Sequence, residues 1–286
     1  MVVKIPLPDD DSVDIVGRTI DEKVHYRAFY DRINDDLISQ IKLYRDREGD
    51  PVFIEPMSLR DYTESDEEAD KRKTSLLGLY RPKEHKMPYE QLEKIRKDNG
   101  LVVCPSCGEA GRPRTLDHYL PQKSFPELAI TLLNLTPMCD WCQGEKGESY
   151  KTATGSKKYI HPYFDDVNIP LYQIVFSKPY ATPIISYSIN SELPIELQEL
   201  VQTHLIGIDF LNRFKGFFKT MYPSVLRRAN ESRIQGNLGL KEVLNMFMRM
   251  ETEKAVNSWE AVLYRSILED EDILYFLENE QLPDNL

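Results

Sequence analysis

The sequence predicts an α+β protein in which a small, metal-stapled centre is flanked by mainly α-helical N- and C-terminal regions. Apolar residues recur at helical spacing through much of the first hundred residues and again from residue 196 to the C-terminus. Between these stretches the chain is rich in loops, and it holds all four cysteines. We therefore divide the chain into a helical N-terminal region (1–100), a stapled core (101–165) and a C-terminal region (166–286) in which a β-hairpin precedes helices.

Three helices are predicted in the N-terminal region. They cover residues 22–48, 66–80 and 88–97, and they are followed by "GDP", "RP" and "DNG". Glycine and proline just beyond an apolar periodic segment are typical of helix ends. No residue pattern in these helices indicates chemistry, so we expect them to serve in packing or docking.

The C-terminal region begins with two β-rich runs. "LYQIVFS" (171–177) and "PIISYSI" (183–189) are separated by "KPYAT", which predicts a hairpin. Helical periodicity then predicts three helices over 196–234, 239–268 and 273–280, interrupted at "GNLG" and "EDED".

Length and composition predict a globular protein of the cytoplasm. The 286 residues, of which 41% are hydrophobic, are enough to bury a core. No apolar run approaches the ~20 residues that a membrane span needs. The N-terminus, "MVVKIPLPDDDSVD", lacks the apolar segment of a signal peptide. We therefore expect a cytoplasmic location and no membrane partner.

The charge distribution singles out the centre of the chain. The net charge of −11 argues against a generally adhesive nucleic-acid-binding protein. Residues 101–164, however, carry seven Lys and Arg against six Asp and Glu. A polyanion would have to be bound locally.

The cysteines form two matched pairs, "CPSC" (104–107) and "CDWC" (139–142). Two Cys-x-x-Cys turns can supply four thiolates to one tetrahedral zinc ion. A four-thiolate shell leaves no position for a substrate water, so this zinc is expected to be structural. The predicted ligands are Cys104, Cys107, Cys139 and Cys142.

Three motifs surround these pairs. They are "LDHYLP" (116–121), "NLTPMC" (134–139) and "CDWCQGEK" (139–146). Together they resemble the HNH endonucleases, the class of ββα-metal nucleases. The resemblance covers about 101–164, and it implies two strands followed by a helix that starts near Gln143.

The resemblance also implies roles for individual residues. Asp117 would bind a catalytic divalent ion, Mg²⁺ or Mn²⁺, and His118 would be the general base that deprotonates water. Asn134 would bind the backbone across the hairpin and fix the His118 ring. Lys146 would face a phosphate as a point charge.

One position departs from the family pattern. After the second Cys-x-x-Cys the family usually has Asn or His, whereas this chain has Gln143. A second candidate ligand is His161, in a stretch "HPYFD" (161–165) that resembles one found after the core in many zinc-stapled members. Position favours Gln143 as the second ligand, and His161 is expected to line the site.

Basic residues supply candidate contacts to nucleic acid. Arg112 and Arg114 lie in a "GRPR" loop and are either DNA contacts or solubilising charges. Lys215 and Lys219 share one helix face by their i,i+4 spacing. They belong to the most basic run of the chain, residues 213–233, which is either a DNA-tracking surface or the solvated face of a core helix.

These observations predict a metal-dependent DNA endonuclease. Two alternatives stay open: a non-catalytic zinc-stapled module that binds nucleic acid or protein, and a ribonuclease that uses the same site. Zinc-stapled HNH proteins with helical flanks resemble effectors of bacterial antiphage and restriction systems. This resemblance implies an ATPase as a partner.

Overall fold

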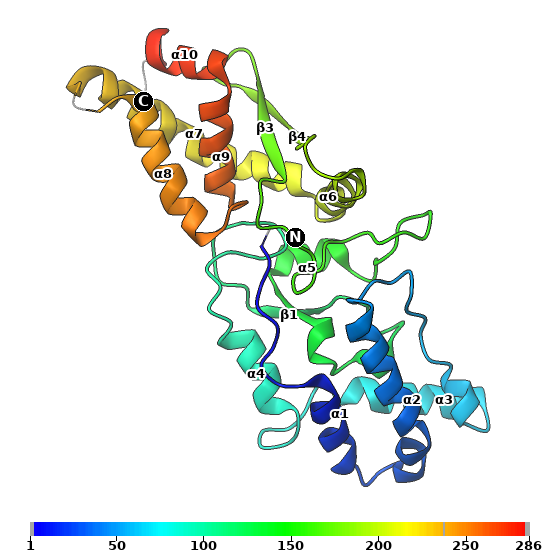
Figure 1. The fold of residues 1–286 in the computed structure, drawn as a ribbon. Coiled ribbons are helices and arrows are strands. Elements are labelled where there is room, and N and C mark those ends of the chain that lie inside the picture. The colour runs from blue at the N-terminus through cyan, green and yellow to red at the C-terminus, as the bar shows by residue number, and fades with distance from the viewer. Residues whose placement is uncertain (1–2, 237, 284–286) are drawn as a thin grey trace. The chain divides into compact units, whose positions relative to one another are not determined.

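A computed structural model describes residues 3–236 and 238–283 of the chain (Figure 1). Helices dominate the described residues, and they are accompanied by two antiparallel sheets of two strands each. The predicted α+β class is therefore confirmed. Within the described ranges, no helix combines the length and the apolarity that crossing a membrane requires.

The contacts divide the chain into two compact units. The amino-terminal unit consists of Ile5–Leu101 and Arg112–Asp165. The carboxy-terminal unit consists of Val102–Gly111 and the chain from Asp166 onward, together with the start of the chain up to Lys4. The division into three regions drawn from the sequence stays a prediction about domain organisation.

Four helices open the amino-terminal unit: α1 (Ser12–Asp21), α2 (Arg27–Asp46), α3 (Asp66–Gly78) and α4 (Tyr89–Lys97). The last three lie within the predicted helices. The helix α1 was not predicted, although its start carries a recognisable signal. The side chain of Asp11 accepts hydrogen bonds from the backbone N–H groups of residues 13 and 14, which otherwise have no partner at a helix start.

Two strands and a helix complete this unit in the order that the family resemblance implies. Strand β1 (Thr115–His118) pairs antiparallel with β2 (Leu135–Met138), with His118 opposite Leu135. Helix α5 (Asp140–Lys146) follows β2 directly. Both strands are short and almost completely buried. Their burial places the end of β1 inside the unit, where Asp117 and His118 lie.

The carboxy-terminal unit begins with the predicted hairpin. Strands β3 (Tyr172–Ser177) and β4 (Ile184–Ile189) pair antiparallel, and the residues of β3 alternate between buried and exposed. This alternation is what a sheet with one solvated face requires. Five helices follow: α6 (Ile195–Gly207), α7 (Phe210–Gln235), α8 (Leu240–Lys254), α9 (Trp259–Glu269) and α10 (Glu271–Asn279).

Two of the predicted long helices were wrong, because each is two helices. The first breaks before α7 at Asp209, whose φ of 49° lies in the left-handed region. The second breaks after α8, and the Ser258 side chain caps the start of α9. Gly207 ends α6 at the first break, whereas the second break contains neither Gly nor Pro, and the apolar periodicity continues across both. Tertiary packing decides these corners: the rings of Phe210 and Phe214 pack edge-on against Trp259, with centroids 6.2 and 5.6 Å away.

Candidate active site and metal centre

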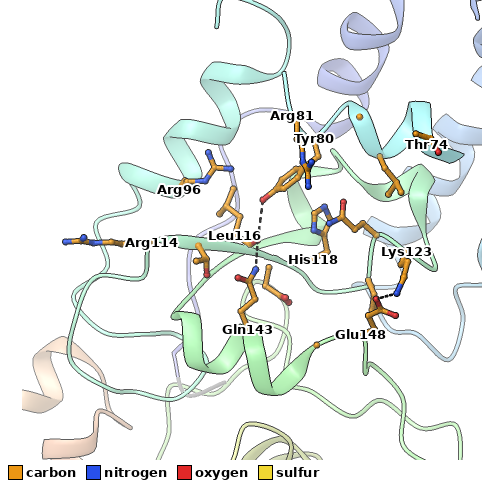
Figure 2. Close-up of a pocket in the computed structure, with 17 residues that line it drawn as sticks. Thr74, Tyr80, Arg81, Arg96, Arg114, Leu116, His118, Lys123, Gln143 and Glu148 are labelled. Atoms are coloured by element: carbon orange, nitrogen blue, oxygen red, sulfur yellow. Dashed lines mark hydrogen bonds and ion pairs between the residues drawn. The ribbon is translucent and has the colours of Figure 1, made fainter. Parts of the chain in front are cut away.

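A cleft of about 840 Å³ opens in the amino-terminal unit. Its walls come from the end of α3 and the turn after it, from α4, from β1 and the loop that follows, and from the end of α5 (Figure 2). Asp117, His118 and Gln143 all line this cleft. The fold therefore brings the Asp-His pair of the first motif and the glutamine of the third motif to one opening.

The imidazole of His118 is held in a defined orientation. Its Nε2 lies 2.9 Å from the carbonyl oxygen of Ala129. A carbonyl oxygen only accepts hydrogen bonds, so Nε2 carries the hydrogen and Nδ1 has the free electron pair. The ring of Tyr80 packs edge-on to the imidazole, with centroids 4.5 Å apart. Burial lowers the pKa of His118 to about 4, so the ring is neutral near pH 7.

Asn134 fixes the loop that holds this histidine. Its Oδ1 accepts a hydrogen bond from the backbone N–H of Leu120 at 2.7 Å, and its Nδ2 donates to the carbonyl oxygens of Leu120 and Leu128 at 3.0 and 3.3 Å. The side chain is completely buried. Leu128 directly precedes Ala129, so Asn134 acts on the His118 ring through the backbone and makes no contact with the cleft.

The same loop contains a buried carboxyl group, Glu127, which gives a testable pH dependence. Burial raises the pKa of Glu127 to about 7, while the backbone N–H of Met57 donates to its Oε1 at 3.1 Å. The folded chain therefore binds this proton more tightly than the unfolded chain. The stabilisation that the protonated Glu127 provides is fully present below the pKa that this group has in the unfolded chain, about 4.3. It is lost as the pH rises through the folded-state pKa of about 7.

We expect Glu127→Gln to flatten the pH dependence of the free energy of unfolding between about pH 5 and pH 8. As the pH rises over that range, the ionisation of Glu127 should lower the free energy of unfolding of the wild-type protein by at most about 3 kcal/mol. The variant has no carboxyl group at this position and should not show this loss. Urea unfolding at both pH values measures the difference. If the free energy of unfolding changes equally with pH in the wild-type protein and the variant, the pKa of Glu127 is not raised.

Lys146 does not occupy the predicted position. It is 2% exposed and does not line the cleft. Its Nζ lies 2.9 Å from Oδ2 of Asp117 and donates to the carbonyl oxygen of His118 at 2.9 Å. The prediction that Lys146 faces a phosphate is therefore not met by this geometry. A buried ammonium needs a charged partner, and Asp117 supplies it.

Gln143 lies at the cleft with its amide fixed. The Nε2 atom donates to the carbonyl oxygen of Leu116 at 3.0 Å, as Figure 2 shows. The amide oxygen is thus the atom with which this side chain could bind a cation. The carboxylate of Asp117 lines the same cleft, so the two side chains offer hard oxygen donors of the kind that Mg²⁺ or Mn²⁺ binds, with waters completing the shell.

His161 does not line the cleft, contrary to expectation. It is completely buried, and both ring nitrogens are bonded: Nε2 to the Tyr44 hydroxyl at 2.9 Å, and Nδ1 to the backbone N–H of Tyr163 at 3.2 Å. The rings of Tyr119 and Phe164 pack on it at 4.1 and 4.6 Å between centroids. These contacts make His161 part of the aromatic core.

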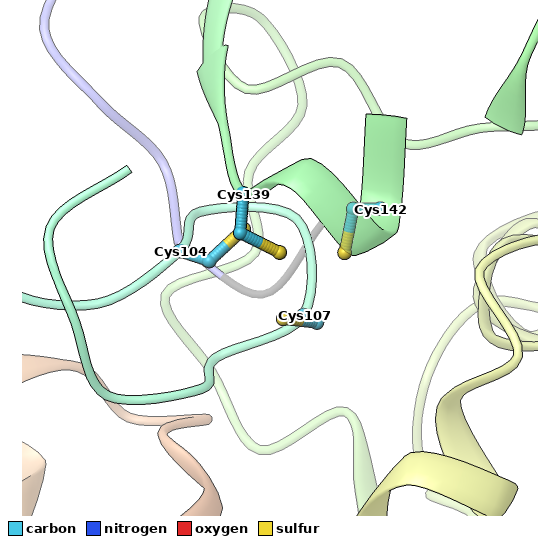
Figure 3. A group of neighbouring side chains, drawn as sticks. All are labelled: Cys104, Cys107, Cys139 and Cys142. Atoms are coloured by element: carbon cyan, nitrogen blue, oxygen red, sulfur yellow. The ribbon is translucent and has the colours of Figure 1, made fainter. Parts of the chain in front are cut away.

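The four cysteines form a cluster suited to a metal ion (Figure 3). Their Sγ atoms all lie within 4.8 Å of one another, and three of the four residues are buried. Tight turns support the pairs: Gly108 N–H donates to the Cys104 carbonyl at 2.8 Å, and Cys139 immediately precedes α5. The donor set is all sulfur, which fits Zn²⁺.

The residues predicted to contact nucleic acid do not all lie at the cleft. Arg114 lines the cleft, whereas Arg112 is outside it and pairs with Asp98 at 3.8 Å. Lys215 and Lys219 are exposed on α7 in the carboxy-terminal unit.

The basic run around these lysines is not entirely a solvent-facing surface. Arg213 forms an ion pair with Glu109 and is largely buried. Arg233 donates hydrogen bonds to the carbonyl oxygens of Phe276, Leu277 and Glu280. Both arginines stabilise the carboxy-terminal unit.

Sequence reasoning missed the residues that α3 and α4 contribute to the cleft. Tyr80 and Arg81 follow α3, and Arg96 lies on α4. They precede the Asp-His pair by twenty residues or more, and no local motif distinguishes them. Only the fold of the chain brings them to the cleft.

Comparisons with known proteins find similarity over part of the chain. Protein ea31 of Escherichia phage lambda is 40% identical over 63 residues, which is 22% of this chain and 21% of that protein. The Septu protein PtuB of Bacillus thuringiensis is 32% identical over 62 residues, or 21% of this chain and 24% of that protein. No protein-family model and no solved structure matches. The chain thus matches between a fifth and a quarter of the length of these curated relatives and is similar in part to both.

Proposed function

We propose that this protein is an HNH-type endonuclease that hydrolyses phosphodiester bonds in DNA with the help of one divalent ion. The observation that supports the proposal most strongly is that Asp117, His118 and Gln143 line one cleft. Zinc on the four cysteines would be structural, because four thiolates complete its shell.

In this proposal, His118 is the general base. Its Nδ1 accepts a proton from the attacking water, while the Ala129 carbonyl holds the Nε2–H and keeps the ring in the reactive tautomer. Asn134 is a positioning residue, because it fixes the loop that carries Ala129. Asp117 and Gln143 would hold a Mg²⁺ or Mn²⁺ ion, which stabilises the negative charge that develops on the phosphate.

The test is cleavage of purified DNA. Supercoiled plasmid, linear duplex, single-stranded DNA and RNA are incubated with the protein, with Mg²⁺, with Mn²⁺ and without a divalent ion. Nicking or linearisation that requires the ion and starts from supercoiled plasmid supports an endonuclease. Cleavage of RNA alone would identify a ribonuclease at the same site.

We expect Gln143→Ala to raise the concentration of Mg²⁺ needed for half-maximal cleavage by about tenfold or more, because one oxygen donor is removed. Gln143→Asn introduces a residue that is usual in the family at this position, and it should need less Mg²⁺ than Gln143→Ala for half-maximal cleavage. Gln173→Ala, an exposed amide on β3, is the matched control. An unchanged requirement in Gln143→Ala would remove this residue from the proposed ligand pair.

One observation favours a second candidate function. The carboxylate of Asp117 is already ion-paired with Lys146 at 2.9 Å, which competes with a cation for the same group. A non-catalytic zinc-stapled module that binds nucleic acid or protein would need no divalent ion there. Such a module would cleave neither DNA nor RNA under any of the conditions above.

A role in antiphage defence is the biological setting that we propose. The partial similarity to the Septu protein PtuB supports it, as does the family resemblance of the motifs. An ATPase partner is part of this proposal. Co-expression with candidate ATPases, followed by affinity purification, tests the partnership.

A further inference from the structure

The cleft is locally basic in an acidic protein. Four basic residues line it, whereas two acidic ones do, and the chain as a whole has a net charge of −11. The basic residues are Arg81, Arg96, Arg114 and Lys123, and the acidic ones are Asp117 and Glu148.

Ion pairs already engage half of these basic side chains. Arg96 pairs with Glu93 on α4. Lys123 pairs with Glu148, with Nζ 2.6 Å from Oε1. Within the described part of the chain, no ion pair involves Arg81 or Arg114. An anion that enters the cleft can therefore bind these two guanidinium groups without first replacing a carboxylate of the protein.

Arg81 lies close to the residues that would perform the reaction. It follows Tyr80, whose ring packs on His118 at 4.5 Å between centroids and whose hydroxyl donates to the Leu116 carbonyl at 3.3 Å. These two contacts fix the turn after α3 against β1. Figure 2 shows Arg81 beside Tyr80 and directed toward the His118 ring in that view, whereas Arg114 lies at the left edge of the group of labelled residues.

We propose that Arg81 is a phosphate-binding residue that holds the nucleic-acid backbone next to His118, with Arg114 binding the backbone further along the cleft. This inference rests on the proposed nuclease function for its substrate class. A guanidinium group donates two parallel hydrogen bonds to a phosphate, a geometry that a lysine ammonium lacks. Arg81 would thus select the phosphodiester that is presented to His118.

The test measures binding separately from cleavage. All variants carry His118→Gln as the parent background, and a fluorescently labelled DNA duplex of mixed sequence is titrated at several salt concentrations. Arg81→Gln is expected to weaken binding about tenfold. It should also lower the log–log salt slope by about 0.9, because one phosphate contact is lost. Arg81→Lys should keep the slope and recover only part of the affinity.

Lys83→Gln is the matched control. Lys83 is exposed, lies two residues from Arg81 and does not line the cleft, so its removal changes the same charge nearby. The proposal is overturned if Arg81→Gln and Lys83→Gln have the same affinity and slope. It is also overturned if the parent binds neither duplex nor single-stranded DNA.

Cleavage by the chain with His118 intact separates this inference from the proposed function. If DNA binding depends on Arg81 but no divalent ion supports cleavage, the nuclease proposal fails and the phosphate-binding role of Arg81 stands. If cleavage occurs and Arg81→Gln leaves both binding and kcat/KM unchanged, the nuclease proposal stands and the role of Arg81 fails.

Discussion

His118→Gln is expected to lower the rate of DNA cleavage by about 10²–10⁴-fold, which is the usual loss when a positioned general base is removed. The glutamine amide can still donate a hydrogen bond to the Ala129 carbonyl that now accepts from Nε2 of the histidine. It cannot accept a proton from water near neutral pH. The substitution therefore removes the chemistry while it keeps the buried contact, which an alanine would leave unpaired.

The readout is the initial rate of plasmid nicking at saturating Mg²⁺ or Mn²⁺. His25→Ala is the control, because His25 is an exposed histidine outside the cleft. Circular dichroism and zinc content should match the wild-type protein in both variants. A His118→Gln protein that nicks as fast as wild type would exclude His118 as the base.

The second large effect is expected at the cysteine cluster. Replacing Cys104 and Cys139 by serine removes one thiolate from each Cys-x-x-Cys pair and should abolish zinc binding. Structural zinc contributes about 10 kcal/mol or more of folding free energy in small modules. That is comparable to the whole stability of a typical domain, about 5–15 kcal/mol. We therefore expect loss of the cooperative unfolding transition of the segment that contains β1, β2 and α5.

Ser106→Ala is the matched control for the double variant. Ser106 lies inside the first Cys-x-x-Cys turn and is completely buried, and its hydroxyl has no hydrogen-bond partner in the described structure. Its removal should change neither zinc content nor Tm appreciably. Elemental analysis and thermal unfolding provide the two measurements. A double-serine protein that retains one equivalent of zinc and a wild-type Tm would show that the cluster is not a zinc site.

Local sequence signals predicted the segments whose structure depends on near neighbours. The β3–β4 hairpin follows from two alternating β-rich runs and a short polar connection. The helices α3 and α4 follow from apolar spacing and the Gly and Pro residues after them. Prediction failed between α8 and α9, where no Gly or Pro signals the break and Trp259 packs against the ring of Phe214, more than 40 positions earlier in the chain.

In the candidate site, too, the motifs predicted some residues and the tertiary structure decided the role of others. The motifs identified Asp117, His118 and Gln143 through their resemblance to the HNH endonucleases, and all three line the cleft. The roles of Lys146 and His161 could not be read from the motifs. Whether a basic side chain faces the cleft or an internal carboxylate, or whether a histidine faces the cleft or an aromatic core, depends on which chain segments pack behind it.

By itself, the sequence determined the α+β class, the two cysteine pairs and the order of strand, strand and helix around the Asp-His pair. The class and the cysteine pairs follow from spacing along the chain, and the order of strand, strand and helix follows from the resemblance of the motifs to the HNH endonucleases. The tertiary structure alone decided that Lys146 neutralises Asp117 at 2.9 Å, that His161 is enclosed by aromatic rings, and that Tyr80 and Arg81 reach the cleft from α3. The contacts that decide these placements include Tyr80 with Leu116, 36 positions apart, and Tyr44 with His161, 117 positions apart. Their formation depends on the burial of whole helix and strand faces, and no local pattern of residues records it.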